Sequence, residues 1–291
     1  MKYIFFGTPD FSARCLTILL DHGIVPITVV CNPDRPVGRK KIITPPPVKT
    51  AAQAWMATTG KTIEILQPEK IDAEFRDHLR VLNSDFFVVY AYNKIFRKET
   101  LDVPLLGTIG IHPSLLPKYR GPSPFQTAIL DGETQTGVTL YFLDEGIDSG
   151  PILAKSDPVP ITDEDTFHSV AMKLAEVGAN LFIKNISDIA SKKITPQPQD
   201  ESQATFTKKF KTEDGFVAPE DLAAAIQGDA EKAHSILRKI NALNPEPGAW
   251  TTTTDGKRMK LLKAKIEGEH LALVETQEEG QKTKRLLPHT S

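Results

Sequence analysis

Hydrophobic residues in the first half of the chain alternate between short apolar runs and longer segments with helical spacing. The runs at 3–6, 26–31 and 85–90 predict strands, and the last is the most continuously apolar, as in a strand buried on both faces. Further strands are expected at 63–66, 108–111, 138–143 and 151–154, and helices at 11–20, 48–56 and 70–82. A long Pro-rich and basic loop is expected at 32–47. This alternation is typical of a parallel α/β sheet.

The second half of the chain begins with one long amphipathic helix. Apolar residues from 167 to 189 keep a spacing of three and four, and this helix is expected to close the first domain. The polar, Pro-containing stretch 192–205 predicts a linker. Another helix is expected at about 219–243, followed by strands from 249 to 275 with a hairpin turn near 267–269. We therefore expect a first domain at 1–191, the linker at 192–205 and a C-terminal domain at 206–291.

Composition narrows the class of protein. The 291 residues are 40% hydrophobic and 25% charged, which is ordinary for a soluble globular protein. The net charge of -2 excludes a polybasic protein that coats nucleic acid or anionic membrane along its whole length. No apolar run is long enough for a membrane span or a secretory signal. The two cysteines suit a cytosolic chain and support neither a disulfide scaffold nor a Cys-based metal site.

Two loops carry candidate acid–base chemistry. His112 ends a predicted strand, where open α/β sheets place their ligands, and a stiff Pro- and Gly-rich loop follows it. The segment 143–151 places three carboxylates in a second loop after another strand. A carboxylate beside His112 would orient the imidazole and raise its basicity. Spacing alone leaves open whether Asp144 or Asp148 is the partner. The alternatives are a structural histidine and a solvated acidic turn.

A basic loop is the third candidate functional segment, and several common catalytic and nucleotide-binding motifs are absent. Four cations on the loop after residue 32 suit phosphate contacts, although a solubilising loop is the commoner role of such a segment. They are Arg35, Arg39, Lys40 and Lys41. The sequence has no Gly-x-Gly-x-x-Gly turn, Walker A loop, His-Glu-x-x-His or Gly-x-Ser-x-Gly motif. No metal site is therefore expected.

Short motifs follow one another along nearly the whole chain, at 6–11, 32–39 with 44–49, 66–70, 112–121, 144–150 and 242–251. Through these motifs and their order the chain resembles the methionyl-tRNA formyltransferases. The segments His112-Pro113-Ser114-Leu115-Leu116-Pro117 and Asp148-Ser149-Gly150 are shared with sugar and nucleotide formyltransferases. The basic loop and the Leu-Asn-Pro segment make the resemblance more specific to the methionyl-tRNA formyltransferases. It implies an α/β fold with a Rossmann-like parallel-sheet formyltransferase domain, followed by a small OB-like β-barrel domain that contacts tRNA.

The resemblance also implies chemistry and partners. A formyl group passes from 10-formyltetrahydrofolate to the α-amine of methionyl-initiator tRNA in the cytoplasm, with no metal, membrane or protein partner. His112 would donate to the developing oxyanion, and Asp148 would hold His112 and assist removal of the amine proton. The expected folate-binding residues are Tyr92, Ser114, Leu115, Leu116, Pro117 and Asp144. The expected tRNA-binding residues are Arg35, Arg39, Lys40, Lys41, Lys208 and Lys209.

The sequence departs from the family pattern in two places. The family's catalytic asparagine falls on Gly110, which has no side chain, and the loss of such a donor typically costs about 10²–10³ in rate. Asn93, where the family usually has glycine, is the candidate replacement, and the alternative is that it only caps a turn. The family also usually continues beyond the end of this chain, so a trimmed C-terminal domain is expected.

Two other functions remain open at this point. One is an N-formyltransferase for a sugar or nucleotide amine, which would need neither the basic loop nor the Leu-Asn-Pro domain. The other is a non-catalytic relative that binds folate or tRNA and lost activity with the asparagine. The presence of both His112 and Asp148 argues against such a loss.

The local placement of cations predicts the salt dependence of tRNA binding. Neither residues 1–204 nor residues 205–291 are strongly basic as a whole. Contacts to phosphates are therefore limited to the loop at 35–41 and to Lys208, Lys209 and Lys211. Few contacts release few counterions, and the dissociation constant should therefore rise only shallowly with salt. Titrations of tRNA at several salt concentrations measure the slope. A steep slope, as for on the order of 6–10 phosphate contacts, would contradict this expectation.

Overall fold

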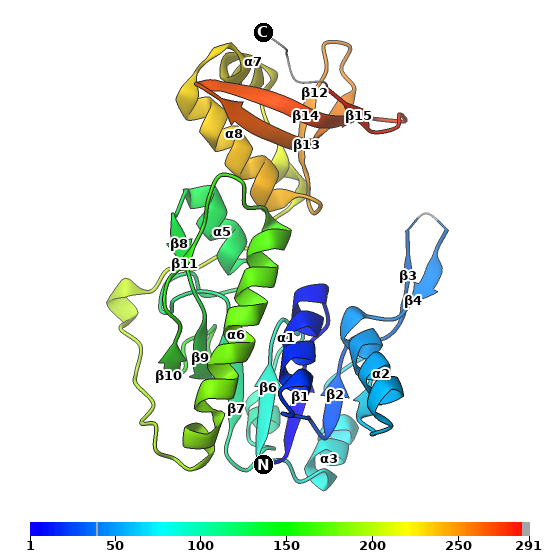
Figure 1. The fold of residues 1–291 in the computed structure, drawn as a ribbon, viewed down its shortest axis with the longest axis vertical. Helices are drawn as coiled ribbons and strands as arrows, with labels where there is room; N and C mark the ends of the chain where they lie inside the picture. The colour runs from blue at the N-terminus through cyan, green and yellow to red at the C-terminus, as the bar shows by residue number, and fades with distance from the viewer. Residues whose placement is uncertain (39, 287–291) are drawn as a thin grey trace. The chain divides into compact units, whose positions relative to one another are not determined.

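The computed structural model describes residues 1–38 and 40–286 and divides into two compact units (Figure 1). Unit 1 contains residues 1–120, 137–158 and 171–205, and unit 2 contains 121–136, 159–170 and the rest of the chain from 206. No helix in the described part of the chain is long and apolar enough to cross a membrane.

Unit 1 is built on a seven-stranded sheet with the order β10-β9-β7-β6-β1-β2-β5. Five strands are parallel, as predicted: β1 (Tyr3–Phe6), β2 (Thr28–Val30), β5 (Glu64–Leu66), β6 (Phe86–Val89) and β7 (Thr108–His112). The two at one edge are antiparallel: β9 (Thr139–Phe142) and β10 (Ile152–Lys155). The sheet is thus mixed, because β9 runs antiparallel to both of its neighbours, β7 and β10.

Helices cover both faces of this sheet, since alternate residues of β1 pack on opposite sides. Tyr3 contacts Phe182 of α6 (Phe167–Ala190), whereas Ile4 and Phe6 pack in a cluster with Leu79 of α3 (Ala73–Val81). The remaining helices of the unit are α1 (Asp10–Asp21), α2 (Pro47–Thr59) and the short α4 (Lys98–Leu101).

Unit 2 combines helices with an antiparallel sheet in the order β12-β13-β14-β15. Its elements include α5 (Pro124–Asp131), a small pair of β8 (Gln135–Thr136) and β11 (Val159–Pro160), α7 (Pro219–Gln227) and α8 (Ala230–Leu243). The strands are β12 (Ala249–Thr252), β13 (Arg258–Glu267), β14 (His270–Glu278) and β15 (Lys284–Arg285). Of the expected barrel, the described residues form this sheet, with β12 and β15 at its edges.

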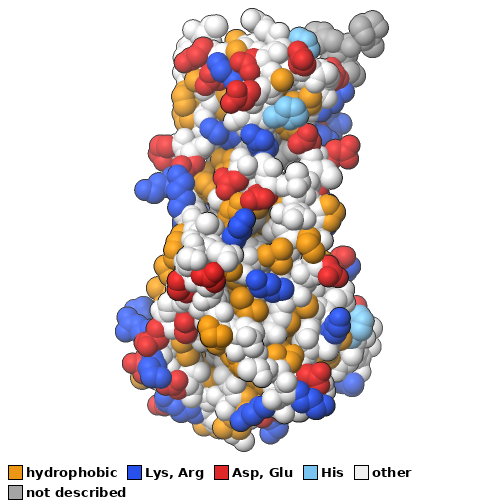
Figure 2. Space-filling model, turned by 90° about the vertical axis from the view of Figure 1, so that its left-hand side faces the viewer, with side chains coloured by type: hydrophobic (Ala, Val, Ile, Leu, Met, Phe, Trp, Pro, Cys, Tyr) orange, Lys and Arg blue, Asp and Glu red, His pale blue; other side chains and the backbone are white. Residues whose placement is uncertain are grey.

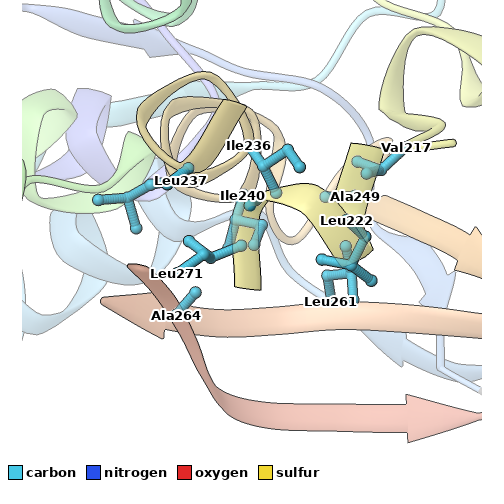
Figure 3. Close-up of a cluster of buried hydrophobic side chains, with 11 residues drawn as sticks. Val217, Leu222, Ile236, Leu237, Ile240, Ala249, Leu261, Ala264 and Leu271 are labelled. Atoms are coloured by element: carbon cyan, nitrogen blue, oxygen red, sulfur yellow. The ribbon is translucent and has the colours of Figure 1, made fainter. Parts of the chain in front are cut away.

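The core of unit 2 is formed by α7, α8 and the sheet (Figure 3). Ile236, Leu237 and Ile240 of α8 lie in one cluster with Leu261 and Ala264 of β13. The spacing of these α8 residues is helical and that of the β13 residues follows a strand with an irregular register.

Two expectations for local structure are wrong. The loop at 32–47 contains a hairpin of β3 (Arg35–Val37) and β4 (Ile42–Thr44). The single helix expected at 219–243 is two, because Gly228 adopts a left-handed φ of 108° and the Asp229 carboxylate then caps α8 by accepting from the Lys232 amide. The stretch 192–205, predicted as a linker, has structure of its own: Gln197 forms a β-bridge with Ile152, and residues 201–203 form a short 3₁₀ helix.

The core of unit 2 predicts a loss of stability on truncation of α8. Ile240→Ala removes a side chain that is 1% exposed and should lower the free energy of unfolding of unit 2 by about 2–5 kcal/mol. Urea unfolding followed by Trp250 fluorescence in a Trp55→Phe background reports on this unit, because the chain has only these two tryptophans. Ile226→Ala on α7, where the side chain is 45% exposed, is the control and should change stability little.

Candidate active site

The histidine predicted from the sequence lies at the carboxyl end of β7, where a parallel sheet exposes its ligand-binding edge. The His112 side chain is only 7% exposed. Its Nε2 lies 2.9 Å from the carbonyl oxygen of Tyr119. Because a carbonyl oxygen can only accept, Nε2 carries the proton in this hydrogen bond, and Nδ1 faces the acidic loop.

The partner of this imidazole in the acidic loop is Asp148. Its Oδ2 lies 3.6 Å from Nδ1 of His112, and its side chain is 22% exposed. Asp148 adopts a left-handed φ of 49°, which is uncommon for a residue other than glycine. A proton taken up at Nδ1 would therefore lie against a carboxylate, an arrangement suited to acid–base chemistry.

The other aspartate of this loop, Asp144, has local hydrogen bonds. Its carboxylate accepts from the Ser149 hydroxyl at 2.9 and 3.1 Å and from the Gly146 amide at 3.0 Å. These bonds close the loop that carries Asp148. The structure thus places Asp148 next to His112 and gives Asp144 contacts that shape the backbone.

The loop after His112 is held by its own polar groups. Ser114 is buried, and its hydroxyl donates to the Lys118 carbonyl at 2.6 Å. The Leu116 amide donates to the Thr139 hydroxyl at 3.0 Å, and the peptide bond between Leu116 and Pro117 is cis. Leu115 and Pro117 remain partly exposed. Of the residues expected to bind folate here, Ser114 and Leu116 therefore also fold the loop.

A strap formed by residues 197–205 joins the histidine loop (residues 112–121) to the aspartate loop (residues 143–151). No motif or periodicity in the sequence indicates this connection. Gln199 donates from Nε2 to the carbonyl oxygens of Asp148 and Gly150, each at 2.8 Å. Its Oε1 accepts from the guanidinium of Arg120 at 2.8 and 3.1 Å. One amide thus joins both loops, because it donates to one of them and accepts from the other.

Arg120 is a buried cation within this strap. Its side chain is 2% exposed and forms two bonds of 2.8 and 2.9 Å with the Glu201 carboxylate. The bond with Glu201 raises the pKa of the guanidinium and lowers that of the carboxyl group. The Thr205 hydroxyl and carbonyl accept from the amides of Tyr119 and Arg120, which fixes the backbone whose carbonyl meets His112.

Two further predicted residues lie on the loop after β6. Tyr92 is buried, with ring contacts to Phe6 and Phe96, and burial raises the pKa of its hydroxyl. Asn93 is exposed, and its amide oxygen accepts from the Asn32 amide at 3.1 Å. Among the contacts of the described residues, none joins Asn93 to His112. Asn93 as a replacement donor stays a prediction.

The candidate tRNA-binding cations are exposed, and some already have acidic partners. Arg35 pairs with Glu69 at 2.5 Å, and Lys208 pairs with Asp214 at 2.5 Å. The side chains of Lys40, Lys41 and Lys209 are exposed, whereas Arg39 lies outside the described residues. On the face drawn in Figure 2, Lys and Arg side chains are interspersed with Asp and Glu. Within residues 1–38 and 40–286, no three His, Cys, Asp or Glu side chains could hold a metal ion.

Comparison with known protein families identifies the family of this chain. The formyl transferase family matches residues 1–186, and the formyl transferase C-terminal domain matches residues 229–283. The chain belongs to the formyl transferase family.

Within that family the chain is similar to methionyl-tRNA formyltransferases. That of Halorhodospira halophila is 39% identical over 248 residues, which cover 85% of this chain and 74% of the relative. The solved methionyl-tRNA formyltransferase from Clostridium thermocellum has a TM-score of 0.64 at 18% identity, covering 96% of this chain and 98% of its own.

A second solved structure has a comparable fold. The N-formyltransferase from Helicobacter canadensis, solved with folinic acid and dTDP-3-aminofucose, has a TM-score of 0.62 at 19% identity, with 92% and 88% of the two chains covered. At such identities the likeness shows the fold alone.

The strap predicts a specific effect of Gln199→Ala. This substitution removes the donor to the Asp148 and Gly150 carbonyls, so the loop at 143–151 should open more often. Hydrogen exchange followed by mass spectrometry should show faster exchange of this loop, by roughly tenfold for the loss of buried hydrogen bonds.

The matched control is Gln197→Ala, since among the described residues the Gln197 side chain donates to the nearby Thr195 carbonyl alone, at 3.0 Å. Exchange of the loop at 143–151 should be unchanged in this variant. Equal exchange in Gln199→Ala and the unmodified protein would show that the strap does not hold the loop.

Proposed function

We propose that this chain transfers a formyl group from 10-formyltetrahydrofolate to the α-amine of methionyl-initiator tRNA. The observation that carries the proposal is the pairing of His112 and Asp148 at 3.6 Å, on the ligand-binding edge of the sheet, in a chain 39% identical to a methionyl-tRNA formyltransferase. We infer a cytoplasmic place of action, because translation begins there.

The reaction forms a bond between the amine nitrogen and the formyl carbon and breaks the bond from that carbon to the folate nitrogen. The amine must lose a proton, and negative charge develops on the formyl oxygen during attack. The Asp148 carboxylate can accept the proton, directly or through the Nδ1 atom of His112 that faces it. The leaving folate nitrogen then takes up a proton, so the transfer is neutral overall.

His112 is suited to stabilise the developing oxyanion, with one adjustment. Its Nε2 proton is directed at the Tyr119 carbonyl oxygen in this structure. Donation to an oxyanion from Nε2 therefore requires the imidazole to exchange this carbonyl for the substrate. Such catalytic hydrogen bonds often tighten only when substrate is present.

The remaining assignments belong to the same proposal. Folate would contact the His112 loop and the loop after β6. The tRNA would contact the β3–β4 hairpin and the lysines near residue 208, in competition with Glu69 for Arg35 and with Asp214 for Lys208. We keep the domain limits 1–191 and 206–291, with the strap residues lying in the intervening segment.

One assay tests the function and the role of His112 together. With 10-formyltetrahydrofolate and charged initiator tRNA, the protein should produce formyl-methionyl-tRNA. His112→Ala should lower kcat/KM by about 10²–10³, as on removal of one oxyanion donor. The control is His78→Ala, which should retain activity. His78 is an exposed histidine on α3 that pairs with Glu64 of β5.

Two outcomes would overturn the proposal. Product from amino sugars or amino nucleotides, with none from methionyl-tRNA, would identify a different acceptor. Folate binding without transfer to any amine would identify a non-catalytic relative.

A further inference from the structure

Gly110 lies in the middle of β7, and its backbone gives no reason for glycine, since its φ lies outside the left-handed region. A Cβ atom at this position would lie 2.3 Å from Cε1 of Tyr141 and 2.5 Å from Cδ1 of Leu143. Tyr141 is also the cross-strand partner of Gly110 in β9. The Tyr141 ring therefore occupies the space that a side chain at position 110 would need.

The hydroxyl of Tyr141 reaches the proposed acid–base pair. The side chain is buried, and the hydroxyl donates to Oδ1 of Asp148 at 2.5 Å. The other carboxylate oxygen, Oδ2, faces Nδ1 of His112 at 3.6 Å. The two rings meet edge to face, with their centroids 6.2 Å apart. One carboxylate is thus held between a phenol and an imidazole.

The phenol remains a donor over the pH range of the reaction. Burial raises the pKa of Tyr141 well above its usual value, and the charge of Asp148 raises it further. Besides Tyr141 on β9 and His112 on β7, two charged groups lie near the Asp148 carboxylate. Arg120 interacts electrostatically with Asp148, and Asp144 of the same loop adds to the rise in the pKa of Tyr141.

We propose that Tyr141 is a positioning residue of this site, whose hydroxyl holds the Asp148 carboxylate against His112, and that Gly110 is required to admit its ring. The inference rests on the proposed function for its kinetic readout. It gives the glycine a structural reason that the sequence does not show. It also supplies a polar group, the Tyr141 hydroxyl, at the place where the family resemblance implies an asparagine side chain.

Tyr141→Phe tests the hydroxyl and keeps the ring. Since hydrogen bonds to charged groups are the strong ones, kcat should fall by about 10- to 100-fold, with KM for both substrates changed by less than about twofold. Without the donor the charged carboxylate is less favoured, so the acidic limb of the kcat/KM profile should move to higher pH. Tyr3→Phe is the control, because it removes a buried hydroxyl bonded to the Ile24 carbonyl at 2.8 Å and should leave the profile unchanged.

Gly110→Ala tests the second half of the proposal. Its Cβ atom must displace the Tyr141 ring, so the variant should lose kcat and shift the acidic limb as Tyr141→Phe does. In a Tyr141→Phe background the same substitution should cost less than about threefold more, because the hydroxyl is already gone. If the double variant instead lost kcat by the product of the two single-variant losses, the two residues would act independently and the coupling between Gly110 and Tyr141 would be overturned. Circular dichroism checks that each variant is folded, and if Gly110→Ala is not, the Tyr141→Phe kinetics decide.

An unchanged kcat and pH profile in Tyr141→Phe would overturn the proposal, and a large loss in Asn93→Ala beside it would move the missing donor to Asn93. A readout without turnover separates this failure from failure of the proposed function. With ¹³C-labelled tyrosine, the Cζ resonance of Tyr141 is assigned by its absence in Tyr141→Phe. It should shift in Asp148→Asn, and a resonance that does not move would refute the contact whether or not the protein transfers formyl groups.

Discussion

The proposed site depends on one carboxylate, that of Asp148, being held in a fixed position with only part of its side chain exposed to water. Asp148 is mostly buried, and a buried charge is tolerated only when its oxygens have hydrogen-bonding or charged partners. Tyr141 and His112 supply those partners from two neighbouring strands, so the position of the carboxylate is set by the register of β7 against β9. The geometry of the proposed acid–base pair is therefore a property of the sheet as well as of the loop.

The loops that surround this carboxylate are held by a buried cation and an amide. Arg120 is charged and almost fully covered, and removal of its partners would leave that charge without compensation, which is strongly unfavourable. Gln199 joins Arg120 to the carbonyl groups of the aspartate loop. A segment whose composition is typical of a flexible linker therefore contributes to the rigidity of the site.

The sequence predicted the parts of this molecule that follow from local pattern. Apolar runs such as Tyr3–Phe6 and the helical stripe of α6 identify their elements, and His112 was found because a strand end is a recognisable place. The choice between Asp144 and Asp148 could not be made from spacing, since both lie in one turn-rich loop. Gln199 was missed because its bond to the Asp148 carbonyl joins residues 51 positions apart in the sequence. Tyr141 was missed because its bond to the Asp148 side chain joins a strand to the loop that follows it, seven residues on, and no periodicity indicates such a contact. The break at Gly228 and Asp229 was visible as a helix stop and a helix start, and the prediction of one helix overlooked it.

The interlock between Gly110 and Tyr141 restricts how this protein can change. A larger residue at 110 has no room while the tyrosine is present, and a smaller residue at 141 leaves a hole beside a glycine. Each single exchange is therefore unfavourable on its own, although a paired exchange conserves volume. An amide-bearing side chain at position 110 therefore requires a change at position 141 as well, and a library that varies these positions one at a time would record substitutions at each as unfavourable.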